Sequence, residues 1–152
     1  MSALKIPMYQ VDAFAGAVFS GNPAAICPLD AWLPDAQMQS IAAENNLAET
    51  AFFVRNGKGY KLRWFTPGVE VDLCGHATLA SAFVILNDLT PDERSVSFET
   101  RSGTLTVTRE GDLYSMDFPS RSLSEYSPTS RVQTKQNRYI MFYAKGLPNL
   151  PS

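Results

Sequence analysis

The stretch VDLCGHATLA, residues 71–80, decides how the rest of this 152-residue chain is interpreted. Asp72, Cys74 and His76 bring a carboxylate, a thiol and an imidazole close together, and Gly75 stands where an extended segment gives way to a predicted helix. Because the first N–H groups of a helix lack backbone partners, the start of this helix favours an anion. The stretch therefore predicts a site for acid–base chemistry on a carboxylate-bearing substrate. The alternative is a buried, inert Cys74 and a His76 that only caps the helix.

The helix that begins at His76 is predicted to run to about Leu86 and to be buried. Leu79, Phe83 and Leu86 recur on one side at helical spacing, and alanines on neighbouring positions allow close packing. Such a helix is expected to lie against a sheet.

A second candidate site residue, Glu49, lies upstream of this stretch. It follows a predicted helix over residues 35–46 and precedes an apolar, aromatic strand over residues 50–54. A carboxylate at such a boundary is partly desolvated, which suits it to proton transfer. The alternative is a solvated glutamate in a turn.

The remaining pattern predicts an α+β fold of mixed to antiparallel sheets on a buried helix. Apolar runs and alternation predict strands near residues 6–14, 24–27, 60–65, 95–99, 104–108 and 113–118, the last three forming an antiparallel meander. Residues 120–137 are polar and are predicted to be a linker. Residues 138–144 (RYIMFYA) could add a strand, but they have no partner nearby in the sequence and must pair elsewhere.

The composition excludes several function classes. The net charge of −2 gives no reason to expect binding to nucleic acid. No apolar run is long enough to span a membrane, and the first residues lack the apolar block of a secretory signal, which favours the cytoplasm. In that compartment the two cysteines, Cys27 and Cys74, are expected to be free thiols. With one histidine in the chain, no zinc site of the usual ligand count is expected.

Five ordered motifs allow the chain to be compared with a known family. They are VDAF (11–14), GNPA (21–24), NLAETAF (46–52), RWFTP (63–67) and VDLCGHATL (71–79). In these motifs the chain resembles the N-terminal part of the PhzF-like phenazine-biosynthesis proteins, which are relatives of diaminopimelate epimerase. The resemblance implies a lobe in which a curved mixed or antiparallel sheet wraps around a central buried helix. It also implies a second, similar lobe, with the active site in the cleft between the two.

The resemblance assigns roles to the candidate residues. Members of the family isomerise or epimerise small carboxylate-bearing molecules by moving a proton, without metal or pyridoxal phosphate, so no cofactor is expected. It implies that Glu49 is the proton carrier and that His76 shares the catalytic pocket and helps hold the substrate. Gly75 and His76 would donate hydrogen bonds to the substrate carboxylate, and Asp72 and Cys74 are counted with them as substrate-binding. Cys74 aligns with one of the two catalytic thiols of the epimerase branch.

Three functional hypotheses follow. The first is a cofactor-independent isomerase that uses Glu49 and His76. The second is an amino-acid epimerase or racemase that uses Cys74 as a thiolate activated by the helix N-terminus. The third is a catalytically silent half-protein that acts by association. Residues 1–119 are predicted to form the lobe, and residues 120–152 a linker with the candidate start of a truncated second lobe. A cleft made by two chains, in a homodimer, would replace the lobe that these residues do not include.

Overall fold

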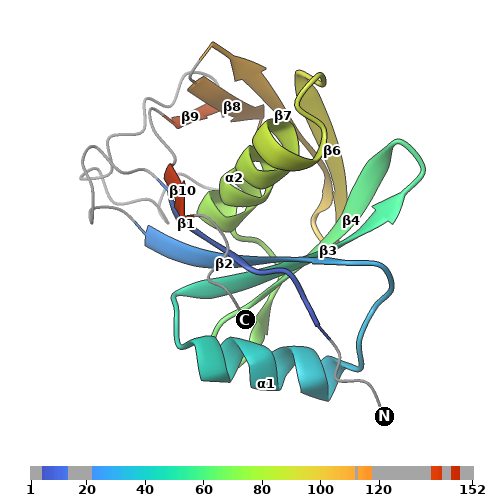
Figure 1. The fold of residues 1–152 in the computed structure, drawn as a ribbon, viewed down its shortest axis with the longest axis vertical. Helices are drawn as coiled ribbons and strands as arrows, with labels where there is room; N and C mark the ends of the chain where they lie inside the picture. Colours follow the sequence, from blue (N-terminus) through green and yellow to red (C-terminus); the bar gives the residue numbers. More distant parts are fainter. Residues whose placement is uncertain (1–4, 14–21, 112, 118–137, 142–144, 148–152) are drawn as a thin grey trace.

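The computed structural model describes residues 5–13, 22–111, 113–117, 138–141 and 145–147, and one curled sheet dominates it (Figure 1). The sheet has ten strands in the order β10-β1-β2-β3-β4-β6-β7-β8-β9, with β5 paired to β4 beside this path. The strands are β1 (Tyr9–Ala13), β2 (Asn22–Leu29), β3 (Glu49–Asn56), β4 (Gly59–Phe65), β5 (Glu70–Val71), β6 (Ser95–Thr100), β7 (Gly103–Glu110), β8 (Leu113–Asp117), β9 (Arg138–Met141) and β10 (Lys145–Leu147).

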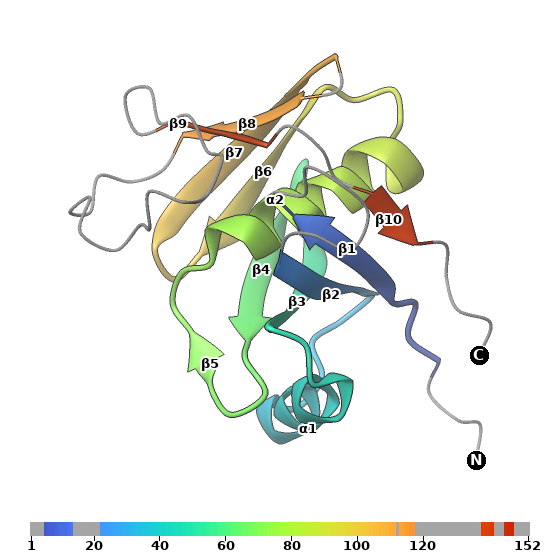
Figure 2. The ribbon, with the colours of Figure 1, turned by 90° about the vertical axis from the view of Figure 1, so that its left-hand side faces the viewer.

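Two helices cross between parallel strands and cover opposite faces of the sheet. The pairs β2–β3 and β4–β6 are parallel, and a parallel pair requires a crossover connection. Helix α1 (Asp35–Asn45) makes the first crossover and lies on the outer face, whereas α2 (Gly75–Val84) makes the second and lies inside the curl (Figures 1 and 2). The sheet is therefore wrapped around α2.

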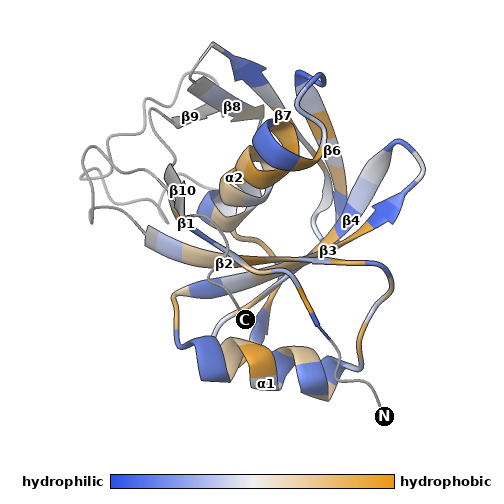
Figure 3. Ribbon diagram, viewed as in Figure 1, coloured by the Kyte–Doolittle hydropathy of each residue, from blue (hydrophilic) through white to orange (hydrophobic). Residues whose placement is uncertain are grey.

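Each face of the sheet has its own core, because side chains alternate along a strand. On β3, Ala51 and Phe53 belong to the larger core around α2, while Phe52 belongs to a smaller core beneath α1. The smaller core also holds Cys27 and Met38. Figure 3 shows that α2 is mostly apolar and that α1 alternates between apolar and polar residues. Helix α2 is therefore a core element, and α1 is a surface helix with one buried stripe.

The predicted end of α1 is confirmed, whereas the end of α2 differs from the prediction. Helix α1 ends at Asn45, and Asn46 takes the left-handed conformation, with φ 51°, that asparagine tolerates. Helix α2 does not continue regularly to Leu86 as predicted. It passes at Ile85 into a π-helical turn, η1 (Ile85–Leu89), closed by a 2.7 Å hydrogen bond from the Thr90 N–H to the Ile85 carbonyl. The apolar pattern did not show this change, because a π-helical segment of 5 residues is too short to establish a spacing of its own.

One glycine is required by a close approach of two strands. A Cβ on Gly59, at the start of β4, would lie 2.5 Å from the carbonyl oxygen of Ser97 in β6. Any larger residue would force the parallel pair apart at this point.

The predicted α+β architecture, with a curved mixed sheet around a central buried helix, is confirmed, as is the meander β6–β7–β8. The strand expected within residues 138–144 is present as β9 and pairs with β8, so its partner comes from the same chain. The predicted linker over residues 120–137 lies outside the described residues. The division at residue 119 stays a prediction. Within the described part of the chain, no helix has both the length and the apolar character needed to cross a bilayer.

Candidate functional site

Glu49 owes its orientation to the register of β3. It is the first residue of the strand and lies opposite Ala24 of the parallel strand β2. Because side chains two apart share a face, Glu49 lies on the same face as Ala51 and Phe53, which pack in the core around α2. The carboxylate is thereby directed toward the inner helix rather than toward α1.

The start of α2 presents a thiol and an imidazole at the same place. Cys74 is the N-cap of α2, with φ −147° and ψ 104°, and His76 is in the first turn. The Cys74 carbonyl accepts two hydrogen bonds from Thr78, one from the backbone N–H (3.1 Å) and one from Oγ1 (2.7 Å). Thr78 is fully buried. This pair of bonds fixes the backbone that carries Cys74.

Glu49, Cys74 and His76 form what we call the site cluster. Oε2 of Glu49 lies 2.5 Å from Nε2 of His76, and Sγ of Cys74 lies 3.4 Å from Nδ1 of the same ring. The side chains of Glu49 and His76 are 17% and 12% exposed, and Cys74 is 7% exposed. The imidazole is therefore held between a carboxylate and a thiol, in a place that is largely shielded but still reachable from solvent.

The environment of Cys74 keeps its sulfur protonated. Burial raises the pKa of the Cys74 thiol, and the nearby charge of Glu49 raises it further. The N–H groups of Ala77 and His76 act in the opposite direction but do not offset these causes. The direction is the reverse of the lowered pKa that an activated thiolate needs.

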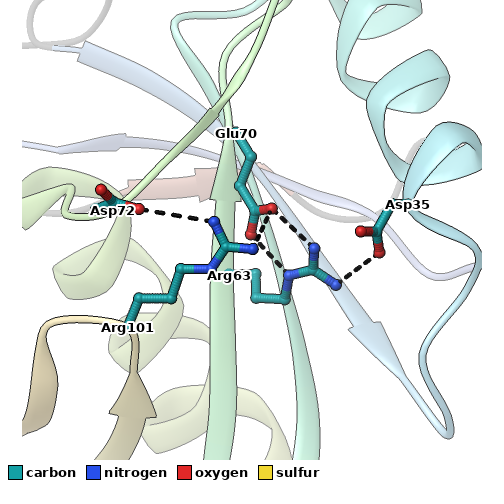
Figure 4. Close-up of polar contacts among 5 residues, drawn as sticks. All are labelled: Asp35, Arg63, Glu70, Asp72 and Arg101. Carbon is teal, nitrogen blue, oxygen red and sulfur yellow. Dashed lines mark hydrogen bonds and ion pairs between the residues drawn. The ribbon is translucent and has the colours of Figure 1, made fainter.

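A second polar group, which we call the arginine network, includes Asp72, two residues before Cys74 (Figure 4). It comprises Asp35, Arg63, Glu70, Asp72 and Arg101. Arg63 donates two hydrogen bonds to the Glu70 carboxylate, at 2.7 and 2.8 Å, and one to Asp35 at 3.0 Å. Its guanidinium also lies 5.4 Å from the ring centres of two aromatic residues, Trp32 and Phe65. Arg63 therefore joins β4, β5 and α1.

Arg101 extends this network toward the segment that leads into α2. It lies 3.0 Å from Glu70 and 3.6 Å from Asp72, and the neighbouring Ser102 donates a 2.8 Å hydrogen bond to the Asp72 carbonyl. These contacts tie Asp72 to the turn between β6 and β7. The backbone just before Cys74 is thus held by two arginines and a serine.

The structure brings together three of the predicted site residues, Glu49, Cys74 and His76. Gly75, the first residue of α2, lies between the last two. Asp72 instead has a side chain that is 71% exposed and is directed at Arg101 (Figure 4). Sequence reasoning missed the positioning contacts of this network. A signal for Arg63 was present, since it stands between the apolar residues Leu62 and Trp64, but nothing in the sequence marked its partners.

The cluster also has the composition of a metal-binding group. One ligand atom from each of Glu49, Cys74 and His76 can be chosen so that all three lie within 4.8 Å of one another. Counting histidines in the sequence did not anticipate this set, because the carboxylate comes from a distant strand.

Comparisons with known proteins agree with the motifs. The phenazine biosynthesis-like protein family, PhzC-PhzF, matches residues 11–142. The chain is 58% identical over 118 residues to an uncharacterized isomerase of Pseudomonas aeruginosa, covering 78% of this chain and 46% of the relative. It is 42% identical over 124 residues to the human phenazine biosynthesis-like domain-containing protein, covering 76% of this chain and 43% of the relative. A solved structure of a PhzF-family protein from Enterococcus faecalis has a TM-score of 0.74 and 56% identity, covering 76% of this chain and 45% of that chain.

The chain spans about half the length of the curated relatives that it matches. The match nevertheless includes both the strand that carries Glu49 and the start of α2, and the solved relative has the same fold. The family match and the shared fold lead to one conclusion, that this chain belongs to the phenazine biosynthesis-like (PhzC-PhzF) protein family.

Proposed function

We propose that this lobe carries the proton-transfer residues of a cofactor-independent isomerase acting on a small carboxylate-bearing molecule. Glu49 removes a proton from carbon and returns it at a second position, and His76 holds Glu49 and the substrate. The observation that supports this most directly is the 2.5 Å contact between Oε2 of Glu49 and Nε2 of His76 at the start of α2. A proton carrier needs such a fixed partner, because its geometry decides which hydrogen it reaches.

The chemistry balances without a redox partner. A C–H bond of the substrate breaks, its electron pair is delocalised toward an adjacent carbonyl or double bond, and the proton passes to the Glu49 carboxylate. The same proton then forms a new C–H bond elsewhere on the substrate, and Glu49 is again ionised. The side chain of Glu49 is 17% exposed, which leaves a route for the substrate while excluding most water.

The N-terminus of α2 supplies the binding partner for the substrate carboxylate in this proposal. The first-turn N–H groups at Gly75 and His76 would donate to it, because they lack partners within the helix and the helix dipole there favours negative charge. The N–H of His76 also faces the Cys74 sulfur, so it would be shared between the two. The same groups would stabilise the charge that builds up as the proton leaves carbon. Binding roles for Cys74 and Asp72 stay predictions, and the described contacts of the Asp72 side chain are with Arg101.

Cys74 supports a thiol mechanism less well than Glu49 supports a carboxylate mechanism. An epimerase of this kind needs a thiolate, and burial and Glu49 raise the pKa of the Cys74 thiol. We therefore assign Cys74 a protonated sulfur beside the imidazole in the resting site, and we place the thiol-dependent reaction second.

A second lobe is part of the proposal, because the family cleft lies between two lobes and this chain spans about half of its relatives. A second copy of the chain in a homodimer is the form that we propose for the 152-residue protein. Light scattering at micromolar concentration should give twice the chain mass. A monomeric mass would leave the association hypothesis without support and would predict weak activity.

The first test of function is hydrogen exchange at carbon. The chain is incubated in D2O with small amino acids, hydroxy acids and cyclic dienoates, and deuterium in the substrate is measured by mass spectrometry. We expect Glu49→Gln to lower the exchange rate by about 10²- to 10⁴-fold, the usual contribution of a general acid–base group. Glu44→Gln is the matched control, since Glu44 is an exposed glutamate in α1. Undiminished exchange in Glu49→Gln would overturn the assignment.

The site geometry has a test that needs no substrate. The chain contains one histidine, so the imidazole signals in long-range ¹H–¹⁵N spectra belong to His76 without further assignment. Glu49→Gln should move the Nε2 signal far more than Glu44→Gln does. Equal spectra would show that the contact does not form in solution.

A further inference from the structure

We propose that the site cluster is also a binding site for one thiophilic divalent cation of the zinc type, held by Glu49, Cys74 and His76. The ion would occupy the place that the proton carrier needs and would therefore oppose the proposed reaction. Only that consequence depends on the proposed function, because ion binding itself is measured without substrate.

The three side chains offer the sulfur, nitrogen and oxygen donors that zinc binds, and these donor atoms lie close together. Zn²⁺ binds cysteine sulfur at about 2.3 Å and histidine nitrogen or carboxylate oxygen at about 2.0–2.2 Å, and a tetrahedral ion places such donors about 3.3–3.6 Å apart. Sγ of Cys74 already lies 3.4 Å from Nδ1 of His76. All three donor atoms fall within 4.8 Å of one another, but Glu49 contacts Nε2, so its carboxylate must leave that nitrogen and turn toward the Cys74 side of the ring to complete the set.

The charges also balance around a buried ion. A dication with one carboxylate, one thiolate and one neutral imidazole has no net charge, so little charge is left desolvated. Binding replaces the S–H bond of Cys74 by a metal–sulfur bond, and the proton passes to the solvent buffer. The three side chains supply three ligands, and the partial exposure of Glu49 and His76 leaves a path for the ion and for a water in the fourth position.

The elements that hold the donors are already ordered. Glu49 begins β3 and is fixed by its pairing with β2, while Cys74 is fixed through its carbonyl by Thr78. Preorganised ligands lose little freedom on binding, which favours affinity. An ion bound here would therefore compete with the contact between Glu49 and Nε2 of His76 that prepares Glu49 for proton transfer.

Co²⁺ is the probe for the test, because it reports both geometry and sulfur coordination by absorption. The metal-free, reduced 152-residue chain is titrated with Co²⁺. We expect saturation at one ion per chain, visible bands of a tetrahedral ion and a near-ultraviolet sulfur-to-cobalt charge-transfer band. Zn²⁺ should then displace Co²⁺ and abolish the colour.

Two cysteine variants make the control. Cys74→Ala should remove the charge-transfer band and weaken Co²⁺ binding by more than about 100-fold. A residue that only orients a metal ligand, without binding the metal, contributes about 10- to 100-fold. Cys27→Ala, at the other buried thiol, should bind like the unmodified chain, since Cys27 packs in the core beneath α1. Equal binding by Cys74→Ala, or saturation without the charge-transfer band, would overturn the proposal.

A further measurement covers the case in which Cys74→Ala fails to fold. In the unmodified chain, one equivalent of Zn²⁺ should slow the alkylation of one thiol at least 10-fold, and peptide mapping should identify that thiol as Cys74. Alkylation of Cys74 at an unchanged rate would overturn the proposal equally. Neither result depends on finding a substrate, so it leaves the proton-transfer hypothesis to its own test.

Discussion

The site cluster and the arginine network are two polar groups that meet just before α2, where Asp72 precedes Cys74 by two residues, and they are built in opposite ways. In the network each arginine faces carboxylates, and its outer members are open to water, with side-chain exposures of 75% for Asp35, 71% for Asp72 and 55% for Arg101. In the cluster one imidazole lies between a carboxylate and a thiol, all largely buried. The network is suited to holding the backbone, whereas the cluster is suited to exchanging protons or ligands.

The difference should appear first in stability. Arg63 is 19% exposed and is the main partner of Glu70, which is 14% exposed. Arg63→Met leaves that carboxylate without its two-pronged partner, and we expect the free energy of unfolding to fall by about 3 kcal/mol. Urea unfolding followed by circular dichroism measures this change.

Two variants control the experiment on Arg63. Arg101→Met removes the more exposed arginine and should cost less than about 1 kcal/mol. Glu49→Gln keeps the shape of a site-cluster side chain and should also stay within about 1 kcal/mol. Equal losses for Arg63→Met and Arg101→Met would mean that Arg63 is not the centre of the network.

The next effect is the stability of the chain at alkaline pH. The ordinary thiol pKa of 9.0 is raised by burial to about 12 for Cys27, and burial and Glu49 raise that of Cys74. Below pH 9 both folded and unfolded chains keep these protons, so the contribution is complete. Above pH 9 the unfolded chain loses them first, and stability falls by up to about 1.4 kcal/mol per pH unit for each thiol.

Cys74→Ala and Cys27→Ala separate the two thiols. The free energy of unfolding is measured between pH 8 and pH 11. Each variant should remove the part of its fall with pH that comes from one thiol. A Cys74→Ala slope identical to that of the unmodified chain would show that Cys74 is not buried as a neutral thiol. It would give Cys74 an ordinary pKa, whereas a steeper fall in Cys74→Ala than in the unmodified chain would indicate a lowered pKa and favour the thiolate mechanism.

The same contrast explains what the sequence could predict. The helix ends, the strand alternation and the meander follow from local rules, and the motifs around Glu49 and His76 marked both residues. The contact between these two residues depends on the parallel pairing of β2 with β3 and on the curl of the sheet around α2. Such long-range pairing has no local signal, so neither the 2.5 Å contact nor the three-donor set could be derived beforehand.

The network was hidden from sequence reasoning for a further reason. Charged residues on exposed strands and turns are common, and most belong to solvated surfaces. Glu70 and Arg101 become partners only because β5 pairs with β4 and the turn after β6 lies beside it. Arg63 did have a signal in the sequence, because it stands between the apolar residues Leu62 and Trp64.

The smallest expected effect concerns the outer edge of the network. The hydrogen bond and charge of Arg63 hold the pKa of the Asp35 carboxyl below its ordinary value of 3.8. A lowered pKa contributes stability above the ordinary value and loses it as pH falls through the folded value. Because Asp35 is open to solvent, this contribution should be slight and should weaken further as salt is added.

Carboxyl ¹³C spectra of the unmodified chain and of Arg63→Met test this edge directly. In the unmodified chain the Asp35 signal should titrate below pH 3.8, and in Arg63→Met it should return to that value. Arg101→Met should leave it low, because Arg63 is the main cause of the shift and the charge of Arg101 is the least. If Arg101→Met moved the Asp35 signal as far as Arg63→Met does, the network would act as one diffuse charge. The arginine network would then differ from the site cluster only in how far its side chains are exposed to solvent.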